Sequence, residues 1–203
     1  NKGDLVAIFY ADFHPRPGKR GGAWMTSYKP QEKIDTPDGK GLIDHRPHIS
    51  NVCNFTKPTA TKPSLLTFNE VTTLFHEFGH GLHGMLANTK YKGLSGTNVS
   101  WDFVELPSQI LENWCYEKQT LELFATHYKT GEVIPMQLIE KIKASATFHQ
   151  GMQTLRQLSF GMLDMAWHSG DPSKISSVKD FENKAFADTS LYPQTSNTCM
   201  STA

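Results

Sequence analysis

The residues best suited to chemistry lie in the string HEFGH, in which His76 and His80 flank Glu77. Two histidines four residues apart project from the same face of an α-helix, because four residues make about one turn. Their imidazoles can bind one Zn²⁺ at about 2.0–2.1 Å. Glu77 is turned by about 100° from His76 around the helix axis, so it can reach a water beside the metal without binding the metal. The pattern predicts one catalytic Zn²⁺ per chain with Glu77 as general base.

The helix that must carry these residues is predicted for about 68–87. Thr67 and Glu70 have the spacing of a capping box, which marks a helix start. Apolar residues then recur at the intervals of three and four that are typical of a buried face: Val71, Leu74, Phe75, Phe78, Leu82, Met85 and Leu86. Gly79 weakens such a helix by about 1 kcal/mol, which indicates a packing or access reason for the glycine.

The other histidines are expected to be structural. His83 is turned away from His80 in the direction opposite to His76, so we expect it to pack or to hydrogen-bond beside the site rather than to bind the metal. The remaining histidines have no comparable spacing: His14, His45, His48, His127, His149 and His168.

The third metal ligand is not fixed by spacing. A catalytic zinc usually takes three protein ligands and leaves one position open, and four carboxylates follow the predicted helix: Asp102, Glu105, Glu112 and Glu117. Glu105 and Glu112 form a polar stripe with Gln109 in an otherwise apolar segment. The same stripe is expected of a solvated helix face, so the choice among the carboxylates stays open.

The remaining elements predict a mainly α fold with a small N-terminal β-sheet beside the zinc-binding helix. Strands are expected in 5–13 and 48–55, with an excursion over the surface between them, at 30–47. Further helices are predicted for about 100–117 with a kink at Pro107, 118–128, 136–168 with a break at Gly151 or Gly161, and 177–187. We expect one catalytic lobe over 1–203, with strands and loops in 1–66 and a helical part carrying the zinc site in 67–203.

Composition limits the partners. Lys plus Arg and Asp plus Glu both number 20, so there is no basic stripe for nucleic acid. The longest apolar run, 5–11, is far shorter than the roughly 20 residues of a membrane-spanning helix. Three cysteines, Cys53, Cys115 and Cys199, form no close pair, which favours reduced thiols and a cytoplasmic location. The chain begins at Asn1 and ends in a polar run, as expected for a piece of a longer protein.

Three strings together resemble a known family: HEFGHGLH at 76–83, SGTN at 95–98 and DFVELPSQ at 102–109. They are similar to the thimet oligopeptidase and peptidyl-dipeptidase (dipeptidyl carboxypeptidase) family of zinc metallopeptidases. A looser similarity runs from Gly3 through KRGGAWM at 19–25 to the end of the chain.

This resemblance implies a third zinc ligand and a place for the substrate. The glutamate of the DFVE string, which the family uses as a ligand, corresponds to Glu105, 25 residues after His80. Glu112 and Asp102 then become acids beside the site or on a helix face. The segment with Gly22 and Ala23 resembles an edge strand beside the substrate cleft, where an extended peptide could pair through its backbone.

The resemblance also implies short peptides as substrates and a longer parent chain. Whole members of the family have a helical part before this segment and a Gly- and Tyr-rich segment after it, which helps to bind substrate and polarise the scissile carbonyl. Release of C-terminal dipeptides is the expected activity. An endo-acting oligopeptidase of the same family is the alternative, as is a zinc-binding fragment that is inactive because the C-terminal segment is missing.

Overall fold

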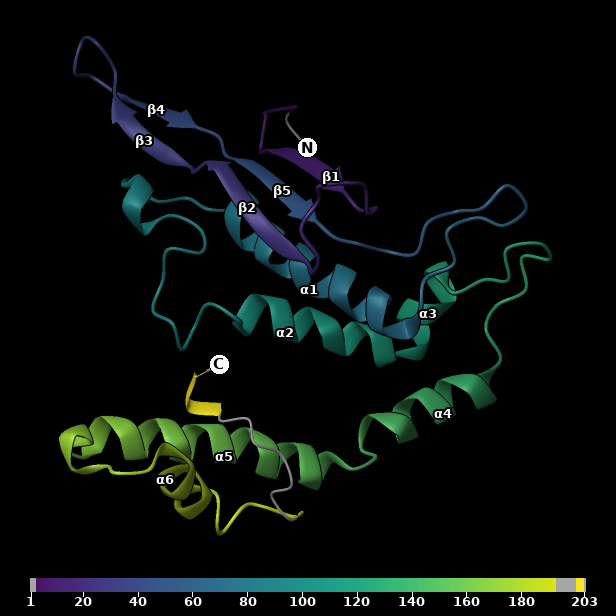
Figure 1. Cartoon of the computed structure of the whole chain (residues 1–203). Coiled ribbons are helices and arrows are strands. Elements are labelled where there is room, and N and C mark those ends of the chain that lie inside the picture. The colour runs from purple at the N-terminus through teal and green to yellow at the C-terminus, as the bar shows by residue number, and fades with distance from the viewer. Residues whose placement is uncertain (1–2, 193–199, 203) are drawn as a thin grey trace. The chain divides into compact units, whose positions relative to one another are not determined.

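The fold is mainly helical, with small sheets near the N-terminus (Figure 1). This computed structural model describes residues 3–192 and 200–202. The chain forms two compact units, 1–139 and 140–203. The single catalytic lobe predicted for 1–203, with strands and loops in 1–66 and a helical part in 67–203, stays a prediction.

The strands of the first unit form two sheets. Strands β1 (Ile8–Asp12), β5 (His48–Val52) and β2 (Trp24–Lys29) make a three-stranded sheet in the order β1-β5-β2, with β1 parallel and β2 antiparallel to β5. The strands expected in 5–13 and 48–55 are therefore confirmed. In the described part of the chain, β2 has a strand partner on one side only, so it is an edge strand.

A second, two-stranded sheet joins β3 (Glu32–Asp35) to β4 (Leu42–His45). The stretch 30–47, which the sequence predicts only as a surface excursion, therefore contains a hairpin. Its turn is closed by hydrogen bonds from the backbone of Thr36 to Gly41 O (2.9 Å) and from the backbone of Gly41 to Thr36 Oγ1 (2.9 Å). Turn-forming residues dominate the composition of this stretch, so its sequence does not indicate the two short strands.

Helix α1 (Phe68–Met85) begins at the predicted capping box. The backbone N–H of Glu70 donates to Thr67 Oγ1, and that of Thr67 donates to Glu70 Oε2. The predicted buried face is only partly right, since Phe78 and Leu86 are 38% and 64% exposed. The residues of this helix that are buried are small or polar: Thr72, Glu77, Gly79, Gly81 and Gly84.

Glycines allow the backbone of α1 to approach its neighbours closely. A Cβ at Gly79 would lie 2.5 Å from both Pro107 O and Ser108 Cα, and one at Gly84 would lie 2.7 Å from Ile49 Cδ1. Glycine is the only residue without a Cβ, so no other residue fits position 79 unless the backbones move apart. The packing role expected for Gly79 is thus explained by its contact with the segment after residue 105.

We expect Gly79→Ala to lower the free energy of unfolding by about 1–3 kcal/mol. Alanine favours a helix by about 1 kcal/mol over glycine, but its methyl group would overlap backbone atoms of Pro107 and Ser108. Gly161→Ala is the matched control, because a Cβ at this helical glycine meets nothing within 4 Å. Denaturant unfolding of both variants measures the effect. Equal stability of Gly79→Ala and the unmutated chain would contradict the close approach.

Helix α2 (Leu106–Glu112) begins six residues later than expected from the sequence. Residues 101–105 form turns; Phe103 N donates to Ser100 O, and Leu106 N donates to Phe103 O. Pro107 lies in the first turn of α2, where its missing N–H is not needed, so the predicted kink is wrong. A short 3₁₀ turn (Asn113–Tyr116) and α3 (Lys118–Phe124) follow, and α3 is shorter than the expected 118–128.

Helices α4 (Met136–Ala146), α5 (Gln150–Ser169) and α6 (Val178–Ala185) complete the order of α-helices in the described part of the chain. The break expected at Gly151 or Gly161 is wrong, because both glycines lie within α5. The chain instead turns at His149, whose φ of 54° is left-handed. Within the second unit, the rings of Trp167 and Phe181 pack against each other with centroids 4.4 Å apart.

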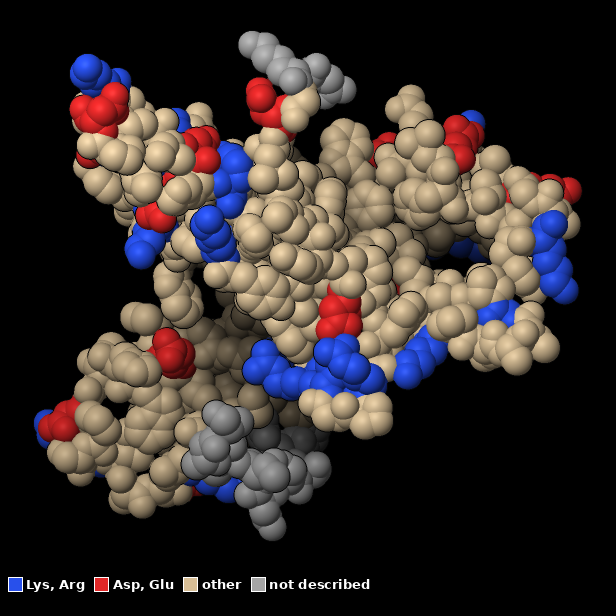
Figure 2. All heavy atoms as spheres, turned by 90° about the horizontal axis from the view of Figure 1, so that it is seen from above, with Lys and Arg blue, Asp and Glu red and all other residues tan. Residues whose placement is uncertain are grey.

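Acidic and basic side chains are interspersed on the face shown in Figure 2, with uncharged surface between them. None of the helices that the structure describes combines the length and apolarity needed to cross a membrane. Cys53 and Cys115 are free and buried, and Cys199 lies outside the described residues. Burial raises the pKa of both described thiols to about 11, with help from nearby carboxylates.

Candidate metal centre

Three potential metal ligands converge between α1 and the start of α2. His76 and His80 lie on one face of α1, with ring centroids 4.9 Å apart. Glu105 Oε2 is 3.3 Å from His76 Nε2 and 3.1 Å from His80 Nε2. Within the described residues, this is the one group of three or more His, Cys, Asp or Glu whose ligand atoms could share a metal ion, all within 4.8 Å of one another. The structure thus brings Glu105 to the two histidines and leaves Asp102 and Glu117 outside the group.

Glu105 is held by the first turn of α2. It occupies the N-cap position, and Ser108 Oγ lies 2.7 Å from Glu105 Oε2 and 2.9 Å from the Glu105 carbonyl oxygen. Ser108 is fully buried where α2 meets Gly79. Its hydrogen bond, together with the two nearby histidines, lowers the pKa of Glu105 below the ordinary value, despite some burial. Sequence reasoning missed Ser108, although its position three residues after Glu105 places it one turn along α2.

Glu112 lies on the opposite side of the His76 ring. Its Oε1 is 2.7 Å from His76 Nδ1. A neutral imidazole has one N–H group, and a carboxylate can only accept a hydrogen bond, so Nδ1 carries the proton. The Nε2 atom of His76 then presents a lone pair toward Glu105. A carboxylate behind a ligand histidine is the common way in which proteins fix the tautomer of a metal-binding ring.

The donor atoms fit a zinc ion. When a neutral His76 donates its Nδ1–H to Glu112, its Nε2 lone pair faces Glu105 Oε2 at 3.3 Å, and lone pairs at this distance repel unless a cation lies between them. Two ligands at about 2.0–2.2 Å from a tetrahedral zinc lie roughly 3.3–3.5 Å apart, close to the two distances in the structure. Two imidazoles with one carboxylate also form a donor set that catalytic zinc uses.

Glu77 stands beside this group without joining it. Its side chain is buried, the residue being only 6% exposed, and its Oε2 has no hydrogen-bond partner among the described residues. Burial raises the pKa of Glu77, repulsion from Glu105 adds to the rise, and the nearby His76 opposes it. Glu77 also lines a cavity of about 270 Å³ together with His76 and Glu112. A carboxylate in this position could exchange protons with a molecule that occupies the cavity.

His83 is not part of the group of ligand atoms. Its ring lies 6.2 Å from that of Phe103, and its Nδ1 is buried without a described partner, as is Nδ1 of His80. Burial lowers the pKa of both histidines below the ordinary value. Lower pKa values favour the neutral rings.

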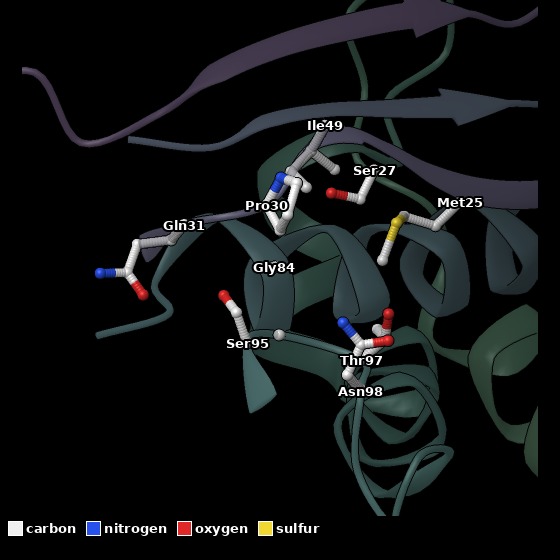
Figure 3. Close-up of a pocket in the computed structure, with 10 residues that line it drawn as sticks. Met25, Ser27, Pro30, Gln31, Ile49, Gly84, Ser95, Thr97 and Asn98 are labelled. Carbon is white, nitrogen blue, oxygen red and sulfur yellow. The ribbon is translucent and has the colours of Figure 1, made fainter. Parts of the chain in front are cut away.

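Gly22 and Ala23 immediately precede the edge strand β2. Gly22 has a left-handed φ of 94°, and its carbonyl oxygen accepts a hydrogen bond of 2.8 Å from Asn54 Nδ2. A cavity of about 190 Å³ lies beneath β2, where side chains of this strand face Gly84 and the segment 95–98 (Figure 3). Its lining contains no ionisable side chain: Met25, Ser27, Pro30, Gln31, Ile49, Gly84, Ser95, Gly96, Thr97 and Asn98.

Comparison with known proteins gives consistent matches. A model of peptidase family M3 matches residues 1–200. The dipeptidyl carboxypeptidase of Escherichia coli (strain K12) is 42% identical over 181 residues, which cover 89% of this chain and 25% of that protein. Oligopeptidase A of the same organism is 45% identical over 168 residues, covering 82% of this chain and 24% of that protein.

A plant relative extends the match over nearly the whole chain. Organellar oligopeptidase A, chloroplastic/mitochondrial, of Arabidopsis thaliana is 41% identical over 196 residues, which cover 95% of this chain and 24% of that protein. The chain therefore spans about a quarter of the length of these relatives. The family resemblance seen in the sequence is confirmed: the chain belongs to peptidase family M3.

Proposed function

We propose that this chain is the metal-binding part of a zinc peptidase that hydrolyses short peptides. His76, His80 and Glu105 hold Zn²⁺, and Glu77 is the general base. The observation that supports this most strongly is the convergence of three ligand atoms within 4.8 Å of one another. The buried carboxylate of Glu77 at the edge of the adjoining cavity supports its role.

Zinc, when bound by these ligands, supplies a Lewis acid that acidifies water and polarises a carbonyl group. Glu77 accepts a proton from the attacking water and delivers it to the nitrogen of the leaving amine. Burial makes this carboxylate a stronger base than one in water, as general-base catalysis near neutral pH requires. Glu112 accepts a hydrogen bond from the Nδ1–H group of His76. The proton therefore stays on Nδ1, and Nε2 stays available as a ligand.

We expect Glu112→Ala to weaken Zn²⁺ binding by about 10-fold to 100-fold, because the His76 ring loses the acceptor that fixes its tautomer and orientation. Glu122→Ala is the control, since it also removes one carboxylate, from an exposed ion pair with Lys118 on α3. Competition with a chelator of known affinity measures both variants. Equal affinity for the two variants would mean that Glu112 does not support His76.

We further propose that an extended peptide pairs with the free edge of β2, next to Gly22 and Ala23. Alternate side chains of a peptide bound in this way point to the same face of the sheet. One of them can enter the cavity beneath β2. The residues that line this cavity carry no charge, and a buried charge without a partner is unfavourable, so the cavity should accept uncharged side chains.

The relatives carry both of the activity names that the sequence suggests, so their names favour neither dipeptide release nor internal cleavage. We propose the release of C-terminal dipeptides, because the SGTN loop at 95–98 resembles that of the peptidyl-dipeptidase members of the family. Catalysis would also need other parts of the parent chain, a helical N-terminal part and a Gly- and Tyr-rich C-terminal segment, because this chain spans only about a quarter of its relatives. The cytoplasmic location stays a prediction.

Mass spectrometry of peptide products tests this function in the full-length enzyme. One peptide has a free C-terminus, and a second copy of it has an amidated C-terminus. A peptidyl-dipeptidase should release dipeptides from the free form and hardly cleave the blocked form, and a chelator should abolish both reactions. Equal cleavage of both peptides at internal bonds would assign the oligopeptidase alternative. Hydrolysis that persists after complete removal of the metal would contradict a zinc peptidase.

A further inference from the structure

Asn51, the fourth residue of β5, is fully buried although its side chain is polar. Neither atom of its side-chain amide has a hydrogen-bond partner among the described residues. An unsatisfied buried amide is unfavourable, and native proteins satisfy most such groups with protein atoms or with ordered water. An apolar residue of the same size would avoid the unfavourable burial. The position therefore calls for a role that an apolar side chain could not fill.

Strand β5 packs against α1 (Figure 1), and its face with Asn51 contacts Gly81 of that helix. Side chains alternate along a strand, so Ile49 and Cys53 share this face with Asn51. Ile49 contacts the Gly84 position, and Asn51 Oδ1 would lie 3.3 Å from a Cβ at Gly81. At the other end of the strand, the carboxylate of Glu77 adds to the rise of the Cys53 pKa that burial causes.

Asn51 consequently lies over Gly81, which is one turn of α1 from Glu77. The two helical positions are four residues apart, about 6 Å along the axis. The Cβ direction at position 81 tilts toward the N-terminus of the helix, and so toward Glu77. Gly81 has no side chain, so the Asn51 amide reaches the backbone of α1 one turn from Glu77.

Glu77, one turn earlier on α1, also carries a buried group that the described residues leave unsatisfied. Its Oε2 is buried and, within the described residues, has no hydrogen-bond partner. Buried waters typically bind to two or more polar groups that the protein leaves unsatisfied. We propose that Asn51 and Glu77 share one ordered internal water, and that Asn51 is thereby a positioning residue that holds the Glu77 carboxylate in place beside the metal ligands. The effect on catalysis rests on the proposed function, whereas the water site itself does not.

Crystal structures of this chain with and without Zn²⁺, at a resolution that shows ordered water, test the site directly. We expect one water within about 2.6–3.2 Å of both the Asn51 amide and Glu77 Oε2, and no such water in the Asn51→Leu variant. A direct contact between the two side chains, or a dry gap between them, would overturn the proposal. Neither result depends on whether the chain hydrolyses peptides.

The kinetics of the full-length enzyme then separate positioning from a purely structural role. We expect Asn51→Leu to lower kcat by about 10-fold to 100-fold, with KM, zinc content and thermal stability close to those of the unmutated enzyme. Asn51→Ser, which keeps a hydrogen-bonding group, should retain more of kcat. Ser50→Ala is the control, because it removes a buried hydroxyl group from the opposite face of β5.

Two results would count against Asn51 as a positioning residue. One is a loss of thermal stability in Asn51→Leu with an unchanged kcat for the folded enzyme. The other is an equal loss of kcat in Asn51→Leu and Ser50→Ala. If the unmutated full-length enzyme hydrolyses no peptide, the proposed function fails, and the two crystal structures still decide the water site.

Discussion

His80→Ala should bind Zn²⁺ on the order of 1,000-fold more weakly than the unmutated chain. Structural zinc sites gain about 10 kcal/mol or more from their ligands together, so the loss of one ligand removes several kcal/mol, and 1.4 kcal/mol corresponds to a factor of ten. His80 Nε2 lies 3.1 Å from Glu105 Oε2, and the ring of His80 lies next to that of His76, with centroids 4.9 Å apart. Equilibrium dialysis with metal analysis measures the affinity.

His83→Ala provides a matched control for this prediction. His83 lies on the same helix, one turn further on, and it is also a histidine with a buried Nδ1, but it is outside the group of ligand atoms. We expect this variant to bind Zn²⁺ as tightly as the unmutated chain. If both variants lose the metal equally, the loss reflects damage to α1 and not removal of a ligand.

In the full-length enzyme, Glu77→Gln should keep its zinc and lose most of its peptide hydrolysis. A glutamine fills the same space but cannot accept the proton, and general-base catalysis typically contributes about 100-fold to 10,000-fold. Glu77 is not a member of the ligand group, so the zinc content should not change. Turnover of a quenched peptide, together with metal analysis of the same sample, measures both quantities.

Glu122→Gln is the control for the charge change, because Glu122 lies in an exposed ion pair on α3. Its turnover should equal that of the unmutated enzyme. Retained turnover in Glu77→Gln would remove Glu77 from the mechanism. Loss of zinc in Glu77→Gln would instead mean that the carboxylate supports the metal.

Local patterns in the sequence were sufficient to predict α1. The capping box at Thr67 and Glu70 and the spacing of His76 and His80 depend on residues within one or two helical turns. The buried face of this helix was predicted less well, because a pattern of apolar residues does not show how near a neighbour comes. The sheet and α2 approach so closely that glycines fill much of the contact.

Contacts between distant segments could not be read from spacing. Glu105 could not be chosen over Glu112 until the packing of Gly79 against Pro107 placed the start of α2 beside the histidines. The resemblance to a known family indicated Glu105 as the third ligand, but it did not indicate the packing that places Glu105 there. The roles of Ser108 and Asn51 depend on burial by other elements, which one sequence does not reveal.

The most direct test of the metal centre is a crystal structure of this chain grown with Zn²⁺, with anomalous diffraction recorded at the zinc absorption edge. We predict one strong anomalous peak per chain, about 2.0–2.2 Å from His76 Nε2, His80 Nε2 and an oxygen of Glu105. The same crystals should show Glu77 beside the ion and not bound to it. A chain without a zinc peak, or with its peak on other residues, would contradict the proposed site.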